Sequence, residues 1–221
     1  MTARGTTSQG TTAAKVIAGQ SLRERQKDET WAAIHEAASA AALEGGLASA
    51  TVEAVAERAG ISRRTFFNYF PTKEDAILGL REPALADEAV AAFRAAGRTA
   101  VGDAVHLMAA AMRAAGLGGM TASRMRSVLV AVPELTTRLK QHVTEVQQIV
   151  EPLIAERLAG RPVEAAELSA ELREHVAVVT LLAGTILKHA YATELAAVAA
   201  GDPAALDRAI DVFRTVSRAE L

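Results

Sequence analysis

Residues 51–75 contain two stretches with the apolar spacing of helices, 52–59 and 63–69, on either side of Gly60. Each stretch is only about two turns long, and helices this short are not stable alone in water. They must therefore pack on a longer helix, which the apolar spacing predicts at residues 22–43. Two short helices joined by a glycine-containing turn are typical of a helix-turn-helix, whose second helix can enter the major groove of DNA.

Residues with a side-chain hydroxyl stand directly before each predicted short helix, where the oxygen can accept a hydrogen bond from the first turn. These residues are Thr51, Ser62 and Thr72. Asp75 stands at the third position of the helix predicted at 73–79 and resembles the acidic half of a capping box. We expect Gly45 and Gly46 to end the long helix, and Pro83 to end or kink the helix that begins at residue 73.

The rest of the chain is predicted to be helical. The predicted segments lie near 84–96, 99–115, 120–131, 134–159, 165–198 and 203–219. No stretch shows convincing period-two alternation of β-branched residues, which a strand would need. We expect an all-α fold of about nine helices. It comprises a disordered tail at residues 1–20, a three-helix DNA-binding domain at 21–80, and a ligand-binding and dimerisation bundle at 81–221.

Apolar and polar side chains separate on the second short helix. If Ile61, Phe66 and Phe70 face the core, other side chains are left facing outward, namely Arg63, Arg64, Thr65, Asn68 and Tyr69. Arginine can pair with guanine, asparagine with adenine, and a threonine methyl with a thymine methyl. The hydroxyls of Ser62 and Thr65, together with Lys73, suit phosphate oxygens, which fix the register of a protein on DNA.

The segment T-V-E-A-V-A-E-R-A-G-I-S-R-R-T-F-F-N-Y-F-P-T-K-E-D resembles the DNA-binding domain of TetR-type regulators, over about residues 22–80. By this resemblance, the residues on the recognition helix are Arg63, Arg64, Thr65 and Asn68, and those that contact the DNA backbone are Thr51, Tyr69 and Lys73. Phe67 stands where the family most often has a phosphate-binding tyrosine, which leaves Phe67 a packing role. The resemblance also implies a C-terminal domain that senses a small molecule and dimerises.

Residues 176–187 are apolar on almost every helical face, yet too few to span a bilayer. Such a helix must be buried all round, either inside one subunit or with one face against a partner. The small residues Ala183, Gly184 and Thr185 would permit close approach of that partner. We expect a homodimer whose interface includes Val178, Leu181, Leu182, Thr185, Lys188 and His189. Two-fold symmetry would then set the recognition helices roughly 34 to 36 Å apart, or a multiple of that, on a palindromic operator.

A methionine-rich set in the middle of the chain could line a ligand pocket. The candidates are Phe93, Val105, Met108, Met112, Leu117, Met120, Met125 and Leu129. Methionine adapts to irregular apolar ligands but also fills ordinary cores, so both interpretations stay open.

The segment S-R-M-R-S-V-L-V-A-V-P-E-L-T-T-R-L at 123–139, with L-R-E-R-Q-K at 22–27 and S-R-R-T-F-F-N-Y-F-P-T-K-E-D at 62–75, is similar to the actinobacterial subgroup that includes mycofactocin-type regulators. This resemblance implies an acyl-CoA or similar long-chain thioester as the effector. Arg124 and Arg126 could pair with its phosphates, and the alternative is that they form ion pairs on the helix surface.

Charge and composition limit the other functions. A sequence-blind architectural DNA-binding protein should be strongly basic, whereas the formal net charge is −2. The five histidines show no paired metal-ligand spacing, and no local catalytic motif occurs, so we expect neither an enzyme nor a metal or cofactor. Cysteine is absent, and we expect a cytoplasmic protein without a membrane span.

The expected mechanism is a population shift. A ligand would tilt the helix that follows Thr72, and so displace the recognition helix of a repressor from its operator.

Overall fold

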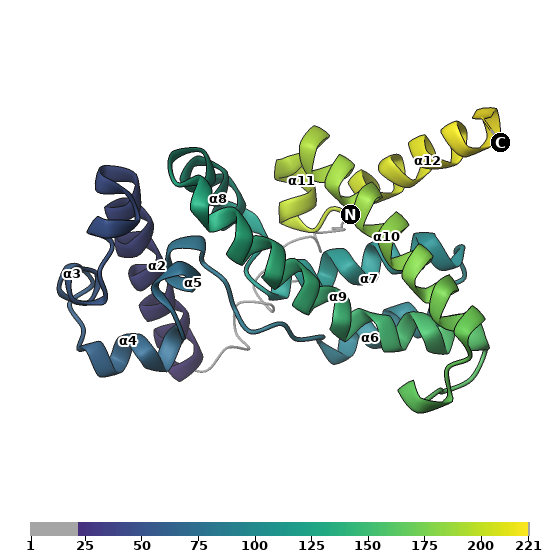
Figure 1. Ribbon diagram of the computed structural model, residues 1–221, viewed down its shortest axis with the longest axis horizontal. Helices are drawn as coiled ribbons and strands as arrows, with labels where there is room; N and C mark the ends of the chain where they lie inside the picture. Colours follow the sequence, from purple (N-terminus) through teal and green to yellow (C-terminus); the bar gives the residue numbers. More distant parts are fainter. Residues whose placement is uncertain (1–21, 221) are drawn as a thin grey trace, which may run out of the picture.

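The computed structural model describes residues 22–220, except for the side chains of residues 119–122 and 220. Within that range the chain forms eleven α-helices, two short 3-10 helices and no strand, which confirms the all-α fold (Figure 1). The helices are α2 (Leu22–Ser49), α3 (Val52–Arg58), α4 (Arg63–Tyr69), α5 (Lys73–Leu78), α6 (Asp87–Ala95), α7 (Ala100–Ala114), α8 (Gly119–Ala131), η1 (Pro133–Leu135), α9 (Thr136–Ala159), η2 (Ala165–Glu167), α10 (Ala170–Thr193), α11 (Leu195–Ala200) and α12 (Pro203–Glu220). The tail predicted for residues 1–20 lies outside the described residues.

The first four helices, α2 to α5, gather at one end of the molecule (Figure 1). The long helix α2 is kinked where the sequence predicts its end, because Gly45 and Gly46 leave the helical conformation. Gly46 has a φ of 72°, which favours glycine. A short turn then continues to Ser49, so that α3 and α4 can fold back onto α2. We refer to residues 22–80 as the head.

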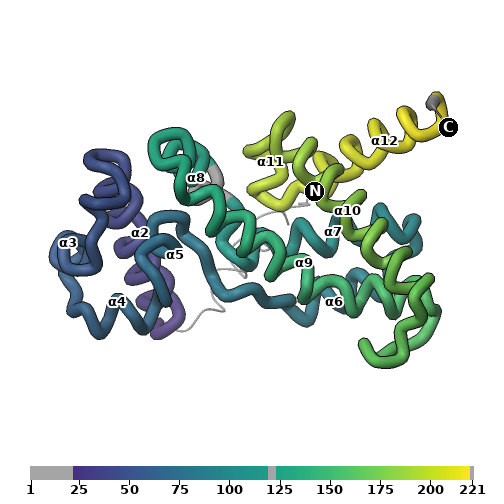
Figure 2. Tube along the Cα trace, viewed as in Figure 1, coloured from purple at the N-terminus to yellow at the C-terminus, as the bar shows by residue number. Residues whose placement is uncertain are grey.

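An extended segment at residues 80–86 connects α5 to α6 (Figure 2). The helix before it ends at Leu78, where Gly79 adopts the left-handed conformation with a φ of 67°. The prediction that Pro83 ends this helix is therefore wrong, since a glycine stops it four residues earlier. The helix predicted at 84–96 begins only at Asp87.

The remaining helices form a bundle in which α7, α9 and α10 pack on one another, and α12 crosses α7 and α10. The continuous helix predicted at 165–198 is wrong, because the chain leaves the helical conformation at Glu194 and starts again as α11. The Glu194 carboxylate forms a bidentate ion pair with Arg208 of α12, a partner distant in sequence. This break adds one helix to the prediction, and the structure has eleven α-helices where about nine were expected.

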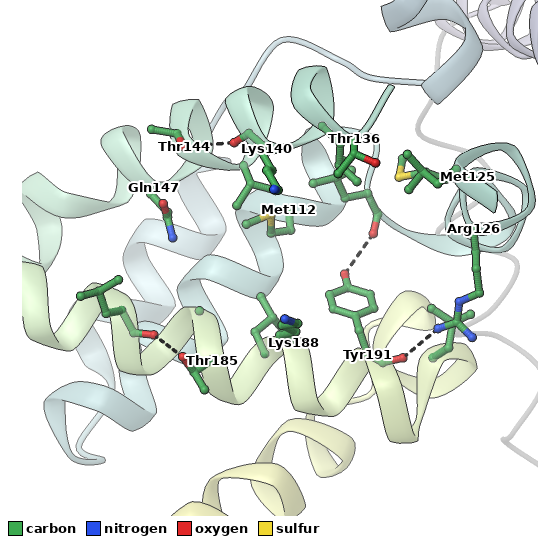
Figure 3. A pocket seen from close by; sticks show the side chains of 18 of the residues that line it. Met112, Met125, Arg126, Thr136, Lys140, Thr144, Gln147, Thr185, Lys188 and Tyr191 are labelled. Carbon is green, nitrogen blue, oxygen red and sulfur yellow. Dashed lines mark hydrogen bonds between the residues drawn. The ribbon is translucent and has the colours of Figure 1, made fainter. Parts of the chain in front are cut away.

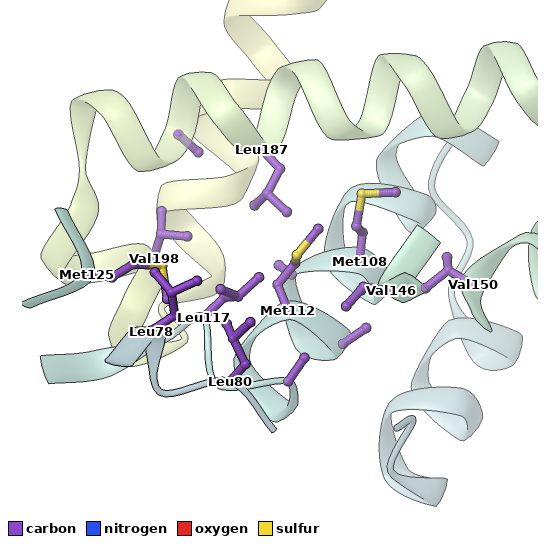
Figure 4. Close-up of a cluster of buried hydrophobic side chains, with 14 of the residues drawn as sticks. Leu78, Leu80, Met108, Met112, Leu117, Met125, Val146, Val150, Leu187 and Val198 are labelled. Carbon is purple, nitrogen blue, oxygen red and sulfur yellow. The ribbon is translucent and has the colours of Figure 1, made fainter. Parts of the chain in front are cut away.

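One apolar core runs through the head and the bundle. Leu78 and Leu80, at the end of the head, lie beside Met112 and Leu117 of the bundle (Figure 4). The apolar cluster is thus continuous across residue 80, where the predicted domain boundary stands. Because the core is closely packed, a movement of the head displaces side chains of the bundle, and the reverse also holds.

Candidate nucleic-acid interface and ligand cavity

Three hydroxyl side chains cap the short helices of the head. The side-chain oxygens of Thr51, Ser62 and Thr72 accept hydrogen bonds of 3.2, 3.0 and 3.1 Å from the backbone N–H three residues later. Each bond satisfies a donor that the start of a helix leaves unpaired. The predicted caps are confirmed, and they fix where each helix begins.

Aromatic packing fixes the orientation of α4. Phe66 and Phe70 are fully buried, with ring centroids 6.1 Å apart, and Phe70 lies 5.5 Å from Trp31 of α2. Val55 and Ala56 of α3 are buried in the same core. The inward face predicted for the two short helices is therefore confirmed at these residues. Because that face is held by bulky rings, the opposite face of α4 has a defined direction.

The opposite face of α4 carries the residues predicted to contact DNA. Ser62, Arg63, Arg64, Phe67 and Asn68 are exposed, whereas Thr65 and Tyr69 are half-buried. Arg63 forms an ion pair with Glu53 of α3 at 3.0 Å. Arg64 and Asn68 make no hydrogen bond or ion pair with any residue that the structure describes. Their donors and acceptors are therefore free for another molecule.

Phe67 departs from the other outward residues because it has no hydrogen-bonding group. Its ring is 51% exposed and meets the buried ring of Phe66 edge-on, with centroids 5.4 Å apart. The structure thus gives Phe67 a packing contact within the head and leaves half of the ring at the surface.

Thr51 and Lys73 lie at the starts of α3 and α5. The Lys73 ammonium donates a hydrogen bond of 2.9 Å to the carbonyl oxygen of Leu47. An ammonium has three N–H donors, so two remain for another acceptor. The Thr51 oxygen accepts its capping bond through a lone pair and keeps its O–H free. Both residues can therefore donate to phosphate oxygens.

A cavity of about 840 Å³ lies between α8, α9 and α10 (Figure 3). Met112, Met125, Leu129, Leu139 and Leu187 form part of its apolar wall. Its polar lining residues are Arg126, Thr136, Lys140, Thr144, Gln147, Thr185, Lys188 and Tyr191.

The charged groups of this cavity are all cationic. Arg126, Lys140 and Lys188 line it, and no aspartate or glutamate is found among the described lining residues. The Tyr191 hydroxyl donates a hydrogen bond of 3.0 Å to the carbonyl oxygen of Leu117. Burial raises the pKa of Tyr191, so the phenol stays neutral. An apolar cavity with three cations suits an anion that carries a hydrophobic group.

The predicted ligand residues divide into separate groups. Met112, Leu117, Met125 and Leu129 line the cavity. Val105 and Met108 are fully buried in the core and do not line it, whereas Phe93 borders a hollow of about 270 Å³ beside Arg157. The side chain of Met120 lies outside the described residues. For Val105 and Met108, the interpretation as ordinary core residues therefore fits.

Arg124 lies outside the cavity. Its guanidinium donates a hydrogen bond of 3.2 Å to Ser39 and lies 3.6 Å from the carboxylate of Glu36, both on α2. Arg126 does line the cavity. Helix α9 adds lining residues that were not predicted from the sequence, namely Thr136, Lys140, Thr144 and Gln147. No local pattern distinguishes them from ordinary surface residues of a helix.

The residues predicted at the dimer interface lie on the outer side of α10. Leu181 is 65% exposed and Val178 is 48% exposed, and Thr185, Lys188 and His189 are exposed as well, whereas Leu182 is half-buried. Two valines of α12, Val212 and Val216, are also exposed. We call Val178, Leu181, Val212 and Val216 the outer apolar face.

One detail of the predicted interface is wrong. Ala183 is fully buried inside its own subunit, and a side chain at Gly184 would contact Gln147 and Met108 of the same chain. These small residues therefore permit close packing of α10 within the bundle. Three residues of the predicted interface also line the cavity, namely Leu181, Thr185 and Lys188.

Helix α10 has 24 residues and a mean hydropathy of 1.4 over its most apolar window, which is enough to cross a membrane by length and composition. This differs from the expectation that no apolar run is long enough. Core helices of soluble proteins meet the same criterion, and 39% of this window is buried within the protein. Among the described residues, no three histidine, cysteine, aspartate or glutamate side chains form a group that could hold a metal ion.

Residues 34–78 match the family model of bacterial regulatory proteins, tetR family. No curated protein matches the chain. The match covers α3, α4, α5 and most of α2, which are the helices that carry the exposed surface described above. The match supports a DNA-binding transcriptional regulator.

Proposed function

We propose that this chain, which carries a tetR-family DNA-binding region at residues 34–78, is a cytoplasmic, dimeric repressor that a hydrophobic anion releases from a palindromic operator. The observation that carries the proposal is the surface of α4. The rings of Phe66 and Phe70 on its inner face are fixed by burial. On its outer face, Arg64 and Asn68 make no hydrogen bond or ion pair with any described residue. A helix held in this way can enter the major groove with its polar side chains free.

The roles of the individual residues follow from their chemistry. Arg64 and Asn68 read bases, because a guanidinium suits guanine and an amide suits adenine. Tyr69 donates to a phosphate beside α4, as does one of the hydroxyls of Ser62 and Thr65, which hydrogen-bond to each other at 2.9 Å. Thr51 and Lys73 donate to phosphates from the starts of α3 and α5. Arg63 must first leave Glu53 to reach DNA, and phosphate oxygens can replace that exposed carboxylate.

The dimer uses the outer apolar face. Val178 and Leu181 of α10, with Val212 and Val216 of α12, would remain in water if the chain were alone. Burial of such side chains against a second copy is favourable, at about 25 cal/mol for each Å² of apolar surface. A two-fold axis there presents two copies of α4 to the two halves of an operator.

The effector binds in the cavity between α8, α9 and α10. The methionines and leucines of the wall accommodate a hydrocarbon chain, while Arg126, Lys140 and Lys188 pair with negative charge. An acyl-CoA combines both features. In this proposal Arg126 takes the phosphate-binding role considered for Arg124, since Arg124 is engaged with α2.

The DNA-binding part is tested by selecting operators from random double-stranded DNA with the full chain. We expect a palindromic sequence to be selected. Arg64→Ala should then lose about 1 to 3 kcal/mol of discrimination at one base pair of each half-site, because a bidentate contact is removed. Equilibrium binding to the operator and to its single-base variants measures this loss.

Arg161→Ala is the matched control, because Arg161 is an exposed arginine that lies on the chain beyond α9, far from the head in sequence. It should bind every operator variant as the wild-type protein does. A uniform loss of affinity in Arg64→Ala would make Arg64 a phosphate contact. A protein that selects no sequence at all would contradict the proposed function.

A further inference from the structure

The head and the bundle are joined by a buried ion pair. Asp75, the third residue of α5, is only 3% exposed. One of its carboxylate oxygens accepts a hydrogen bond of 2.7 Å from the Thr72 hydroxyl, at the start of the same helix. The other accepts a bond of 2.7 Å from Nε of Arg138 on α9. A carboxylate that completes the cap of α5 therefore also holds a helix of the bundle.

Further contacts return from Arg138 to the connection that follows the head. Arg138 also donates to Glu145 at 3.2 Å, and the second oxygen of that carboxylate lies 3.3 Å from Nδ1 of His142. Nε2 of His142 donates a bond of 2.9 Å to the carbonyl oxygen of Ala115, which also accepts the backbone N–H of Arg81 at 3.0 Å. The first turns of α9 thus contact α5 directly, through Asp75, and contact the connection after α5 indirectly, through the carbonyl oxygen of Ala115.

The same turns of α9 form a wall of the cavity. Thr136 and Lys140 line it (Figure 3), and so does Val143. Arg138 and His142 instead make the contacts with the head and its connection. Positions three and four residues apart share one face of a helix, so these two sets occupy different faces of α9. Because a helix is stiff over two turns, an occupant that displaces the cavity wall also displaces Arg138.

Burial distinguishes this ion pair on α5 from an ion pair that links α2 to the bundle. The pair of Arg124 with Glu36 is longer, at 3.6 Å, and the Glu36 side chain is 72% exposed, so water can replace either partner. Asp75 is shielded from water and would be left as an unpaired buried charge if Arg138 moved away. The contact is therefore either made or broken, with no favourable position between.

We infer that the Asp75–Arg138 ion pair sets the direction of the head relative to the bundle, and that displacement of α9 by an occupant of the cavity breaks it. The inference rests on the proposed function. In a dimer, the directions of the two heads determine the distance between the two copies of α4. Asp75 and Arg138 are accordingly positioning residues, which contact neither DNA nor the occupant of the cavity.

The test measures how operator affinity depends on half-site spacing, with no effector present. Adding one base pair between the half-sites turns one of them by about 36° and moves it by about 3.4 Å. A wild-type dimer with fixed heads should lose at least about tenfold in affinity for this longer operator. In Arg138→Gln and in Asp75→Asn the heads are released. In these variants the longer operator should bind only about threefold more weakly, or less, than the selected operator, while affinity for the selected operator itself falls.

Arg94→Gln is the matched control, because Arg94 pairs with Glu156 of the same helix α9 without touching the head. It should keep the wild-type dependence on spacing. A purely structural role of Asp75 and Arg138 would lower the fraction of active protein and reduce affinity equally for both operators. That result, or a wild-type dependence in both variants, would overturn the inference and leave the proposed function intact. A wild-type protein that selects no operator with two half-sites would overturn both.

Discussion

His35 illustrates how a single buried group can limit the conditions under which the head is stable. The ring is 6% exposed, and Nδ1 donates a hydrogen bond of 2.8 Å to the carbonyl oxygen of Ala76 in α5. Nε2 is buried without a hydrogen-bond partner among the described residues, beside the ring of Trp31. Burial lowers the pKa of His35, and the nearby charge of Arg124 lowers it further, although the bond to Ala76 opposes this shift. The imidazole is therefore neutral in the folded protein.

The first consequence is a pH dependence of stability. In the unfolded chain His35 takes up a proton near its ordinary pKa of 6.5, whereas in the folded protein it does so only at lower pH. The unfolded state thus binds more protons in this window, and the free energy of unfolding falls as the pH drops below 6.5. The fall ends below the folded pKa, and its slope cannot exceed about 1.4 kcal/mol per pH unit for one proton. Urea denaturation at pH values from 7.5 to about 5 measures it.

His35→Gln provides the comparison, because glutamine can keep a donor for Ala76 but does not titrate. Other groups also titrate in this range, so the difference between the two proteins isolates His35. The variant should lose less stability on acidification than the wild-type protein. Identical pH profiles would mean that His35 is not the group responsible.

At the scale of helices and turns, the backbone of the α5–α6 connection closely approaches the backbone of the turn after α7. Gly116 has a φ of 89°, and a Cβ atom added to it would lie 2.2 Å from the carbonyl oxygen of Gly79. The neighbouring Arg81 N–H donates to the carbonyl oxygen of Ala115 at 3.0 Å. Only a residue without a side chain permits this approach.

Gly116→Ala should therefore destabilise the protein by about 1 to 3 kcal/mol, from backbone strain and from the separation of the two turns. Gly97→Ala is the control, since a Cβ at Gly97 meets no atom within 4 Å. It should change the free energy of unfolding by no more than about 0.5 kcal/mol. Chemical denaturation of both variants measures the two effects, and equal stabilities would contradict this account of the junction.

The elements that could be predicted from the sequence are those with local causes. The caps at Thr51, Ser62 and Thr72 need only a hydroxyl and the N–H groups that follow it, and the all-α fold follows from apolar spacing. The break at Glu194 could not be predicted, because it accompanies an ion pair with Arg208 on another helix. The burial of Ala183 likewise depends on which side of α10 the bundle occupies. The wall that α9 gives the cavity is set by packing, which no local pattern in the sequence reveals.

At the scale of the whole molecule, the outer apolar face and the cavity meet on one helix. Leu181 belongs to the face and also lines the cavity, and Thr185 and Lys188 lie on the same side of α10. The head lies at the opposite end of the molecule from the free end of α12 (Figure 1). A partner that covers α10 and α12 therefore leaves α4 accessible to DNA.

A charge on the outer apolar face should separate the proposed dimer. Val178→Glu and Val216→Glu change residues that do not line the cavity, so they leave the cavity itself intact. Each should shift the protein to monomers at micromolar concentration, because a carboxylate would lose its water on association. Operator affinity should fall by about a hundredfold or more, since each head then binds alone. Sedimentation and operator titration measure the two effects.

Leu43→Glu serves as the control, because Leu43 is an exposed leucine of α2, outside the outer apolar face. Its sedimentation should match that of the wild-type protein. If the Val178 and Val216 variants stayed dimeric, the subunits would have to associate through another surface.

The shared carboxylate of Asp75 bears on the construction of hybrid biosensors, in which the reader of one regulator is grafted onto the sensor of another. A splice at residue 80 would part Asp75 from Arg138 and Gly79 from Gly116, although both pairs lie across that point in the native chain. A transplanted reader would then need an acid at the position of Asp75 and a glycine at the position of Gly79, whose φ of 67° favours glycine. In hybrids that preserve both pairs, effector binding should change the affinity for the operator. In hybrids joined at residue 80 without these pairs, the effector should bind without changing that affinity.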